Sequence, residues 1–184
     1  MQQLCKWIFH KLLGWNFTGE FPDQKKVIII IAPHTSNADF LIGKLIFCVK
    51  RIKPYFLIKE QWFRPYIGWL TKALGGIPVS KTSNNSTVKF ILKNLKQKKE
   101  FYLNITPEGT RSPVKRWKKG FYKLSLQTGI PILPGYIDYK KKEIGVGKLI
   151  YPSGDYNKDI QYLKSFYKDV TARHPEKFNI NCIK

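Results

Sequence analysis

A histidine and an aspartate lie five residues apart in the polar stretch His34-Thr35-Ser36-Asn37-Ala38-Asp39. In a continuous helix this spacing is a rotation of about 500°, so the two side chains would point apart. They can meet only if the chain turns between them. Ser36 is expected to cap a helix that begins near Asn37, and the cap folds Asp39 back toward His34. One ring nitrogen would then bond the carboxylate and the other would act as a general base.

A second polar stretch carries groups that bind an oxyanion. It reads Thr106-Pro107-Glu108-Gly109-Thr110-Arg111-Ser112. The guanidinium of Arg111 can hold an oxyanion with two parallel hydrogen bonds, and Gly109 lets the backbone approach a ligand closely. Glu108 can orient the arginine or accept a hydrogen bond from a hydroxyl. Lys81 follows a short extended segment and can add positive charge at the same place.

Each of the two polar stretches follows an apolar segment. Val27 to Ile31 is a short β-branched run, which is typical of a strand buried on both faces. Residues 101–105 form a second predicted strand. Ligand sites in parallel sheets lie outside the carboxyl ends of the strands, so we expect both polar turns at one edge of a sheet. Backbone N–H groups of residues 35–37, at the start of the helix, are candidates for stabilising a developing oxyanion there.

The order and spacing of the two turns resemble the glycerolipid acyltransferase family, whose best-known members are 1-acylglycerol-3-phosphate acyltransferases. The resemblance extends from about residue 15 to residue 150 and includes two weaker blocks, residues 76–81 and 130–134. In the first of these blocks Lys81 stands where the family usually has arginine. Lysine keeps the charge but lacks the planar fork that pairs with a phosphate.

The resemblance implies a single layered α/β domain with a mainly parallel sheet flanked by helices. It also implies transfer of a fatty acyl group from acyl-CoA or acyl carrier protein to a hydroxyl of a lysophospholipid such as 1-acylglycerol-3-phosphate. His34 would be the general base and Asp39 would orient it. The acyl donor is a substrate, so neither a metal ion nor a cofactor is expected. The acceptor would be bound by Glu108, Gly109, Thr110, Arg111 and Lys81.

Three alternatives stay open from the sequence. The acceptor could be another hydroxylated lipid, such as an acyl-amino-acid lipid. The formal net charge of +21, from 33 Lys and Arg against 12 Asp and Glu, also suits a basic nucleic-acid-binding domain. That function needs neither His34 nor Asp39 and leaves both polar turns unexplained, so nucleic acid is not the expected partner. A non-catalytic membrane-binding relative is the third, and the intact histidine and aspartate argue against it.

At 184 residues the chain is expected to form one catalytic domain, residues 15–184, preceded by an amphipathic helix at residues 1–14. Strands alternate with helices, which predicts an α/β fold. Helices are expected at 2–14, 37–49, 60–74, 85–98, 119–129 and 159–173. Strands are expected at 15–20, 27–32, 55–58, 77–79, 101–105, 131–139 and 143–150. The stripe expected to be buried in the fourth helix consists of Val88, Ile91, Leu92 and Leu95.

Two segments have more than one interpretation. The helix at 1–14 could lie on a membrane surface or pack on the core. Residues 60–74 interleave aromatic and basic side chains, which suits a core helix, a membrane interface or single-stranded nucleic acid.

The cysteines and the hydropathy pattern bear on where the protein works. Cys5, Cys48 and Cys182 are few, odd in number and unclustered, which predicts neither a disulfide framework nor a zinc site and favours a reducing compartment. No apolar run is long enough for a transmembrane helix, and the first residues lack the pattern of a secretory signal. We therefore expect a cytoplasmic protein that binds the inner face of an anionic membrane peripherally.

Overall fold

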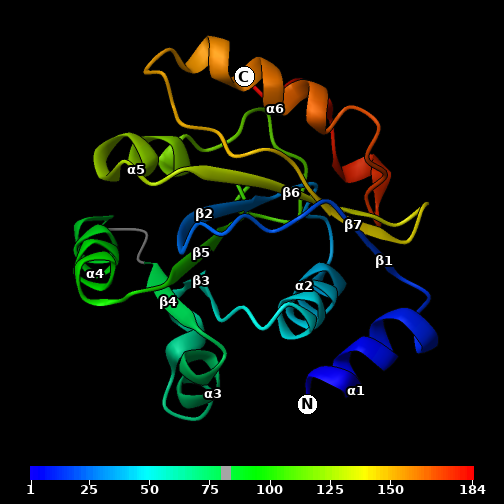
Figure 1. Ribbon diagram of the computed structural model, residues 1–184. Helices are drawn as coiled ribbons and strands as arrows, with labels where there is room; N and C mark the ends of the chain where they lie inside the picture. Colours follow the sequence, from blue (N-terminus) through cyan, green and yellow to red (C-terminus); the bar gives the residue numbers. More distant parts are fainter. Residues whose placement is uncertain (80–83) are drawn as a thin grey trace.

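The computed structural model describes residues 1–79 and 84–184, which form a seven-stranded sheet in the order β1-β7-β6-β2-β5-β3-β4 (Figure 1). The strands β6 and β7 pair antiparallel and the other neighbours pair parallel, which confirms the expected mainly parallel sheet. The strands are β1 Asn16–Thr18, β2 Lys26–Ile31, β3 Pro54–Lys59, β4 Gly76–Val79, β5 Phe101–Ile105, β6 Ile132–Asp138 and β7 Glu143–Val146.

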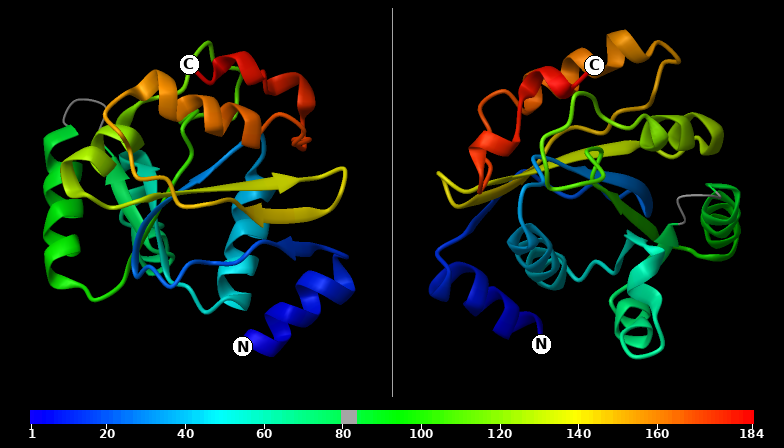
Figure 2. Two further views of the ribbon diagram at one scale, coloured as in Figure 1. Left: turned by 45° about the horizontal axis from the view of Figure 1, so that its top comes forward. Right: turned by 180° about the vertical axis from the view of Figure 1, so that it is seen from behind.

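Helices cover both faces of this sheet (Figure 2). The helix α2 packs on one face, and α1 and α3 stand on the same side of the sheet, as Figures 1 and 2 both show. The helices α5 and α6 cover the other face. The helices are α1 Gln2–Trp7, η1 Ile8–Leu12, α2 Asn37–Val49, η2 Glu60–Phe63, α3 Gly68–Ala73, α4 Asn84–Gln97, α5 Gly120–Thr128, α6 Tyr156–Phe166, η3 Pro175–Lys177 and η4 Ile180–Cys182.

The strand β2 lies at the centre of the sheet, between β5 and β6, and is buried on both faces. Successive side chains of a strand point to opposite faces. Ile28 and Ile30 accordingly join the cluster formed with α4, α5 and α6, whereas Val27 and Ile29 pack with Phe47 of α2. The strand that leads into the first polar turn is therefore held firmly on both sides.

The last long helix, α6, is shorter than the expected 159–173 and begins earlier. It begins at Tyr156 because the Asp155 carboxylate caps it, accepting hydrogen bonds from the amides of Asn157 and Lys158. It ends at Phe166, and Tyr167 continues the buried row of Ile160 and Leu163 into the core. The Tyr167 hydroxyl is fully buried and donates to backbone carbonyls of β2 and β6. The chain beyond it is thereby free to return to the sheet edge.

The helix α4 buries a narrower stripe than the sequence predicts. Ile91 and Leu95 are buried and Val88 is half-buried, but Leu92 is 36% exposed, so that part of the prediction is wrong. The buried row continues to Thr87, whose hydroxyl donates to the carbonyl of Pro78 in β4. Positions four residues apart are neighbours on a helix surface, and Thr87, Ile91 and Leu95 form such a row.

The aromatic segment between β3 and β4 is not a core helix. It forms two short helices, η2 and α3, with Pro65 between them rather than at a helix start. Trp62, Tyr66 and Trp69 are 48%, 90% and 69% exposed. The segment packs against the edge strand β4, but Gly68 and Thr71 are the only buried residues of α3. Over the described ranges, none of the helices combines the length and the apolar character needed to cross a bilayer.

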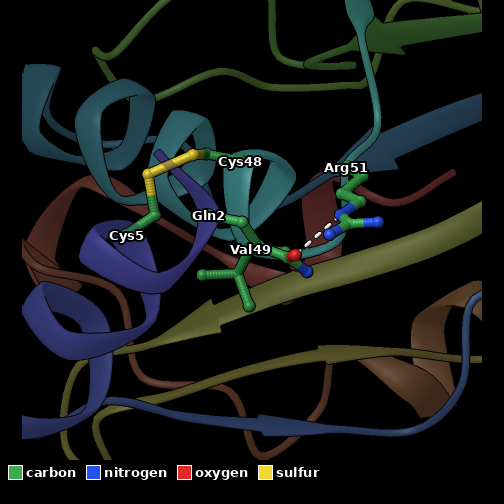
Figure 3. The surroundings of a disulfide bond; sticks show 5 residues. All are labelled: Gln2, Cys5, Cys48, Val49 and Arg51. Carbon is green, nitrogen blue, oxygen red and sulfur yellow. Dashed lines mark hydrogen bonds between the residues drawn. A yellow bond between two sulfur atoms is a disulfide. The ribbon is translucent and has the colours of Figure 1, made fainter.

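A disulfide joins Cys5 of α1 to Cys48 near the end of α2, with the Cα atoms 6.2 Å apart (Figure 3). Beside it, the Gln2 amide donates to the carbonyl of Val49 at 2.9 Å. The expectation that the cysteines form no disulfide framework is wrong for Cys5 and Cys48, and the argument for a reducing compartment loses its basis. Pairing depends on how α1 packs against α2, which cysteine spacing does not reveal. Cys182 is a free, buried thiol.

Candidate active site

The first polar turn brings His34 and Asp39 into contact, with 3.0 Å between Nδ1 and Oδ2. Ser36 caps α2 as predicted, and its hydroxyl oxygen accepts from the amide of Ala38 at 3.2 Å. The Ser36 amide in turn donates to Asp39 Oδ2 at 2.9 Å. This reciprocal cap is what folds the carboxylate back toward the imidazole.

The Asp39 carboxylate is buried and uses both oxygens. Oδ2 also accepts from the Thr35 amide at 2.9 Å, and Oδ1 accepts from the Tyr139 hydroxyl at 2.7 Å. Burial alone would raise the pKa of this carboxyl, but hydrogen bonds from His34, Tyr139 and Ser36 outweigh burial and lower it. Asp39 is therefore an anion at neutral pH, and it can only accept hydrogen bonds. The proton between the two residues consequently belongs to His34 Nδ1.

The other ring nitrogen of His34 is available for chemistry. The side chain is 19% exposed, and no residue in the described part of the chain bonds to Nε2. A neutral imidazole with its proton on Nδ1 has an unprotonated Nε2, which can take a proton from a hydroxyl group. The backbone amides of residues 35–37 were the expected oxyanion donors. The Thr35 and Ser36 amides instead donate to Asp39, and these contacts leave the Asn37 amide available.

The second polar turn meets the first through Glu108. Its Oε1 accepts a hydrogen bond from the His34 amide at 3.1 Å, and the residue is only 5% exposed. Burial, to which the negative charge of Asp39 adds, raises the pKa of Glu108 to about 8. Its Oε2 is buried without a hydrogen-bond partner among the described residues. The carboxyl group bonded to the His34 amide is therefore neutral at neutral pH.

Gly109 has a φ of +64°, in the left-handed region that favours glycine. The ammonium of Lys118 lies against it, because a Cβ at this position would be only 2.8 Å from Lys118 Nζ. The Lys118 amide also donates to the carbonyl of Pro107 at 2.9 Å. Lys118 thus adds a positive charge to this loop, and no spacing in the sequence had singled it out.

The remaining predicted acceptor residues lie farther out. Thr110 is half-buried, and its hydroxyl oxygen accepts from the amide of Ser112 at 3.4 Å. Arg111 is exposed and pairs with no carboxylate in the described ranges. Lys81 lies outside the described residues. Within the described parts, no group of three or more His, Cys, Asp or Glu side chains could hold a metal ion.

Tyr139 is a site residue that the sequence analysis missed. The strands β5, β2 and β6 are adjacent and parallel, so their carboxyl ends meet at one edge. Glu108, His34 and Tyr139 follow these three strands in that order. The signal was the position of Tyr139 at the end of a predicted strand. That position points to the site only when it is known that β6 pairs with β2.

The chain after α6 returns to the same edge. The carbonyl of Thr171 accepts from the Tyr139 amide at 2.9 Å, and the His174 amide donates to the Thr35 hydroxyl at 3.2 Å. The guanidinium of Arg173 lies over the Tyr139 ring, 5.9 Å from its centroid. This C-terminal segment therefore braces both Tyr139 and the first polar turn.

Comparison with known proteins gives three consistent matches. A family model described as acyltransferase matches residues 15–138. The 1-acyl-sn-glycerol-3-phosphate acyltransferase BAT2, chloroplastic, of Brassica napus is 31% identical over 94 residues, which cover 49% of this chain and 25% of that protein. The 1-acyl-sn-glycerol-3-phosphate acyltransferase of Borreliella burgdorferi is 29% identical over 136 residues, 71% of this chain and 53% of that protein.

The chain thus spans a quarter to about half of the length of these two relatives. Among solved structures, the crystal structure of the 1-acyl-sn-glycerophosphate (LPA) acyltransferase PlsC from Thermotoga maritima superposes with a TM-score of 0.63. The alignment covers 91% of this chain and 75% of that one at 19% identity. At this identity the likeness establishes the fold.

Proposed function

We propose, because this chain belongs to the acyltransferase family, that it transfers a fatty acyl group from acyl-CoA or acyl carrier protein to a hydroxyl of a lysophospholipid. The proposed acceptor is 1-acylglycerol-3-phosphate, the substrate class in the names of both relatives. The observation that carries the proposal is the His34–Asp39 contact, which leaves an unprotonated ring nitrogen at the edge where the parallel strands end.

The proposed reaction is a direct attack on the thioester. His34 Nε2 takes the proton of the acceptor hydroxyl while the hydroxyl oxygen bonds to the thioester carbonyl carbon. The Asp39 carboxylate stabilises the imidazolium that forms. The C–S bond then breaks, and the departing thiolate receives the proton back from the imidazolium. A well-placed general base of this kind contributes about 10²–10⁴-fold to the rate.

The acceptor would be held by the second polar turn and by Lys81. In this proposal Glu108 fixes the loop against the His34 amide, as the 3.1 Å contact supports. Arg111, exposed on the same loop, pairs with the phosphate of the acceptor. Gly109 and Thr110 let the loop backbone approach the acceptor closely.

The proposal places the protein on an anionic membrane, at the inner face of the cytoplasmic membrane. Residues 1–14 would be the membrane-surface helix and residues 15–184 the acyltransferase domain. Phe9 packs α1 and η1 onto the core, while Leu4, Trp7 and Leu12 are 59%, 55% and 63% exposed. One side of this segment therefore packs on the core, and its exposed side supports the proposed contact with a membrane.

Many of the exposed apolar residues belong to the segments that form α1, α2 and α3, and these helices stand on one side of the sheet (Figures 1 and 2). Basic residues accompany them, and each basic side chain near an anionic leaflet adds about 1 kcal/mol of attraction. The apolar group, called the apolar face below, consists of Leu4, Trp7, Leu12, Leu13, Leu41, Trp62, Tyr66, Ile67, Trp69 and Leu70.

A substrate panel tests the proposed function. Purified protein is offered lysophosphatidic acid, uncharged lysolipids and hydroxylated acyl-amino-acid lipids, each with acyl-CoA and with acyl carrier protein as donor. We expect an acylated product with lysophosphatidic acid and at least one donor. Product with the acyl-amino-acid lipid alone would replace the acceptor class, and no product with any pair would contradict the acyltransferase activity.

A further inference from the structure

Among the described residues, Tyr139 is the one side chain outside the two polar turns that hydrogen-bonds to the His34–Asp39 pair. Its hydroxyl donates to Asp39 Oδ1 at 2.7 Å, whereas the imidazole and two backbone amides all bond to Oδ2. The two carboxylate oxygens are therefore assigned to different partners. A carboxylate rotates about its terminal bond with a broad, roughly two-fold preference unless hydrogen bonds fix it.

The phenol ring is itself held from several directions. Trp15 meets it edge-on, with ring centroids 5.2 Å apart, and the Arg173 guanidinium covers it. The Tyr139 amide is bonded to the carbonyl of Thr171. The hydroxyl thus points at Asp39 from a position that β6 and the C-terminal segment fix together.

We propose that Tyr139 is a positioning residue for acyl transfer: its hydroxyl locks the Asp39 carboxylate so that Oδ2 faces the imidazole and keeps the proton of His34 on Nδ1. This inference rests on the proposed function for its link to catalysis. Without that hydrogen bond the carboxylate can turn away from the imidazole, and His34 then spends part of its time in orientations or tautomers that cannot act as a base.

The hydroxyl also balances the charge that the imidazole experiences. The titratable and charged groups around Asp39 are His34 on its own turn, Glu108 after β5, Tyr139 after β6 and Arg173 after α6. The phenol shares the negative charge of Asp39 by donating to it. When that donor is removed, Oδ1 loses the partner that holds it away from the imidazole, so the share of His34 with its proton on Nδ1 should fall.

The test compares Tyr139→Phe with Tyr136→Phe in the full-length protein. Tyr136 lies on the same strand and donates to Glu143 across the β6–β7 hairpin, so the control removes an equivalent hydroxyl–carboxylate bond away from the site. For Tyr139→Phe we expect kcat to fall about tenfold with little change in the KM for the acceptor. Tyr136→Phe should change neither.

A second measurement separates this inference from the proposed function. Nitrogen NMR of the His34 imidazole, without substrate, reports its tautomer even if no acceptor is ever found. We expect Tyr139→Phe to reduce the Nδ1–H tautomer. An unchanged imidazole, or equal losses of kcat in both variants, would overturn the inference.

If Tyr139→Phe does not fold, the reciprocal change decides. Carbon NMR of the Tyr139 ring in Asp39→Asn should show its hydroxyl titrating at lower pH than in the wild type, because the carboxylate is one cause of its raised pKa. No change in that titration would overturn the inference equally.

Discussion

Glu108 Oε1 accepts a hydrogen bond from the backbone amide of His34 at 3.1 Å, although 74 residues separate them in the chain. The two polar turns are thereby one structural unit, built where β2 and β5 end side by side. Any change to the Glu108 carboxyl should consequently be felt at the imidazole.

Replacing Glu108 by glutamine should change how stability depends on pH. Burial raises the pKa of Glu108 to about 8 from an ordinary value of 4.5, so the folded protein keeps a proton that the unfolded chain releases. The wild type should therefore lose stability, relative to Glu108→Gln, as the pH rises from 4.5 to about 8. The slope is of the order of 1 kcal/mol per pH unit. Urea unfolding at a series of pH values checks this, and a constant difference between the proteins would contradict it.

Substitutions of Glu108 also test whether catalysis depends on its hydrogen bond to the His34 amide or on its carboxyl group. Glutamine keeps an oxygen that can accept from the His34 amide, whereas alanine leaves that amide without its partner. We expect Glu108→Gln to retain most of kcat and Glu108→Ala to lose roughly 10- to 100-fold. Steady-state rates with lysophosphatidic acid measure this, and equal losses in the two variants would show that the contact with His34 is not what matters.

Gly109→Ala should destabilise the loop that carries Arg111. Its φ of +64° costs an L side chain about 1–2 kcal/mol, and the new Cβ would press on the Lys118 ammonium, which can move. Gly109→Asn is the matched variant, since asparagine tolerates the left-handed region better. The midpoint of thermal unfolding should be highest for glycine, lower for asparagine and lowest for alanine. The KM for the acceptor should be lowest for glycine, higher for asparagine and highest for alanine. Equal behaviour of the two variants would contradict the strain argument.

The sequence predicted the sheet and the His34–Asp39 contact because both depend on local rules. An isoleucine run, a serine cap and a carboxylate three residues later leave few ways to fold. The exposure of Leu92 and of the segment around Trp69 could not be predicted in the same way, because an apolar side chain is buried only if another element reaches it. That depends on β4 being the edge of the sheet.

Contacts between distant parts of the chain also could not be predicted from the sequence. Tyr139 lies 100 residues from Asp39, and Cys5 lies 43 from Cys48. Neither pair has a spacing with meaning in itself. The first follows from the order of strands in the sheet, and the second from the packing of α1 on α2. Both become visible only when the fold is known.

The disulfide should make stability sensitive to reductant. Closing the chain between Cys5 and Cys48 restricts the unfolded state and is worth about 2–4 kcal/mol. A thiol reductant should therefore lower the urea midpoint of the wild type and leave Cys5→Ser unchanged. Alkylation of the unfolded, unreduced protein should modify Cys182 alone. Modification of all three cysteines before reduction would show that the bond does not form.

The apolar face should govern membrane binding. We expect Leu4→Ala with Trp7→Ala, and separately Trp69→Ala with Leu70→Ala, each to weaken binding to anionic vesicles about tenfold or more. Leu126→Ala is the matched control, since Leu126 is 46% exposed on α5, across the sheet. Vesicle sedimentation measures the affinity at several salt concentrations. A loss as large in the control, or none in the double variants, would contradict a docking role for this face.

The proposed acyl transfer depends most directly on the imidazole of His34. The decisive measurement is the rate of acyl transfer to lysophosphatidic acid by His34→Ala, together with its binding to anionic vesicles. If His34 is the general base, turnover of the thioester is abolished while vesicle binding stays at the wild-type level. Acyl transfer by His34→Ala at the wild-type rate would contradict this role.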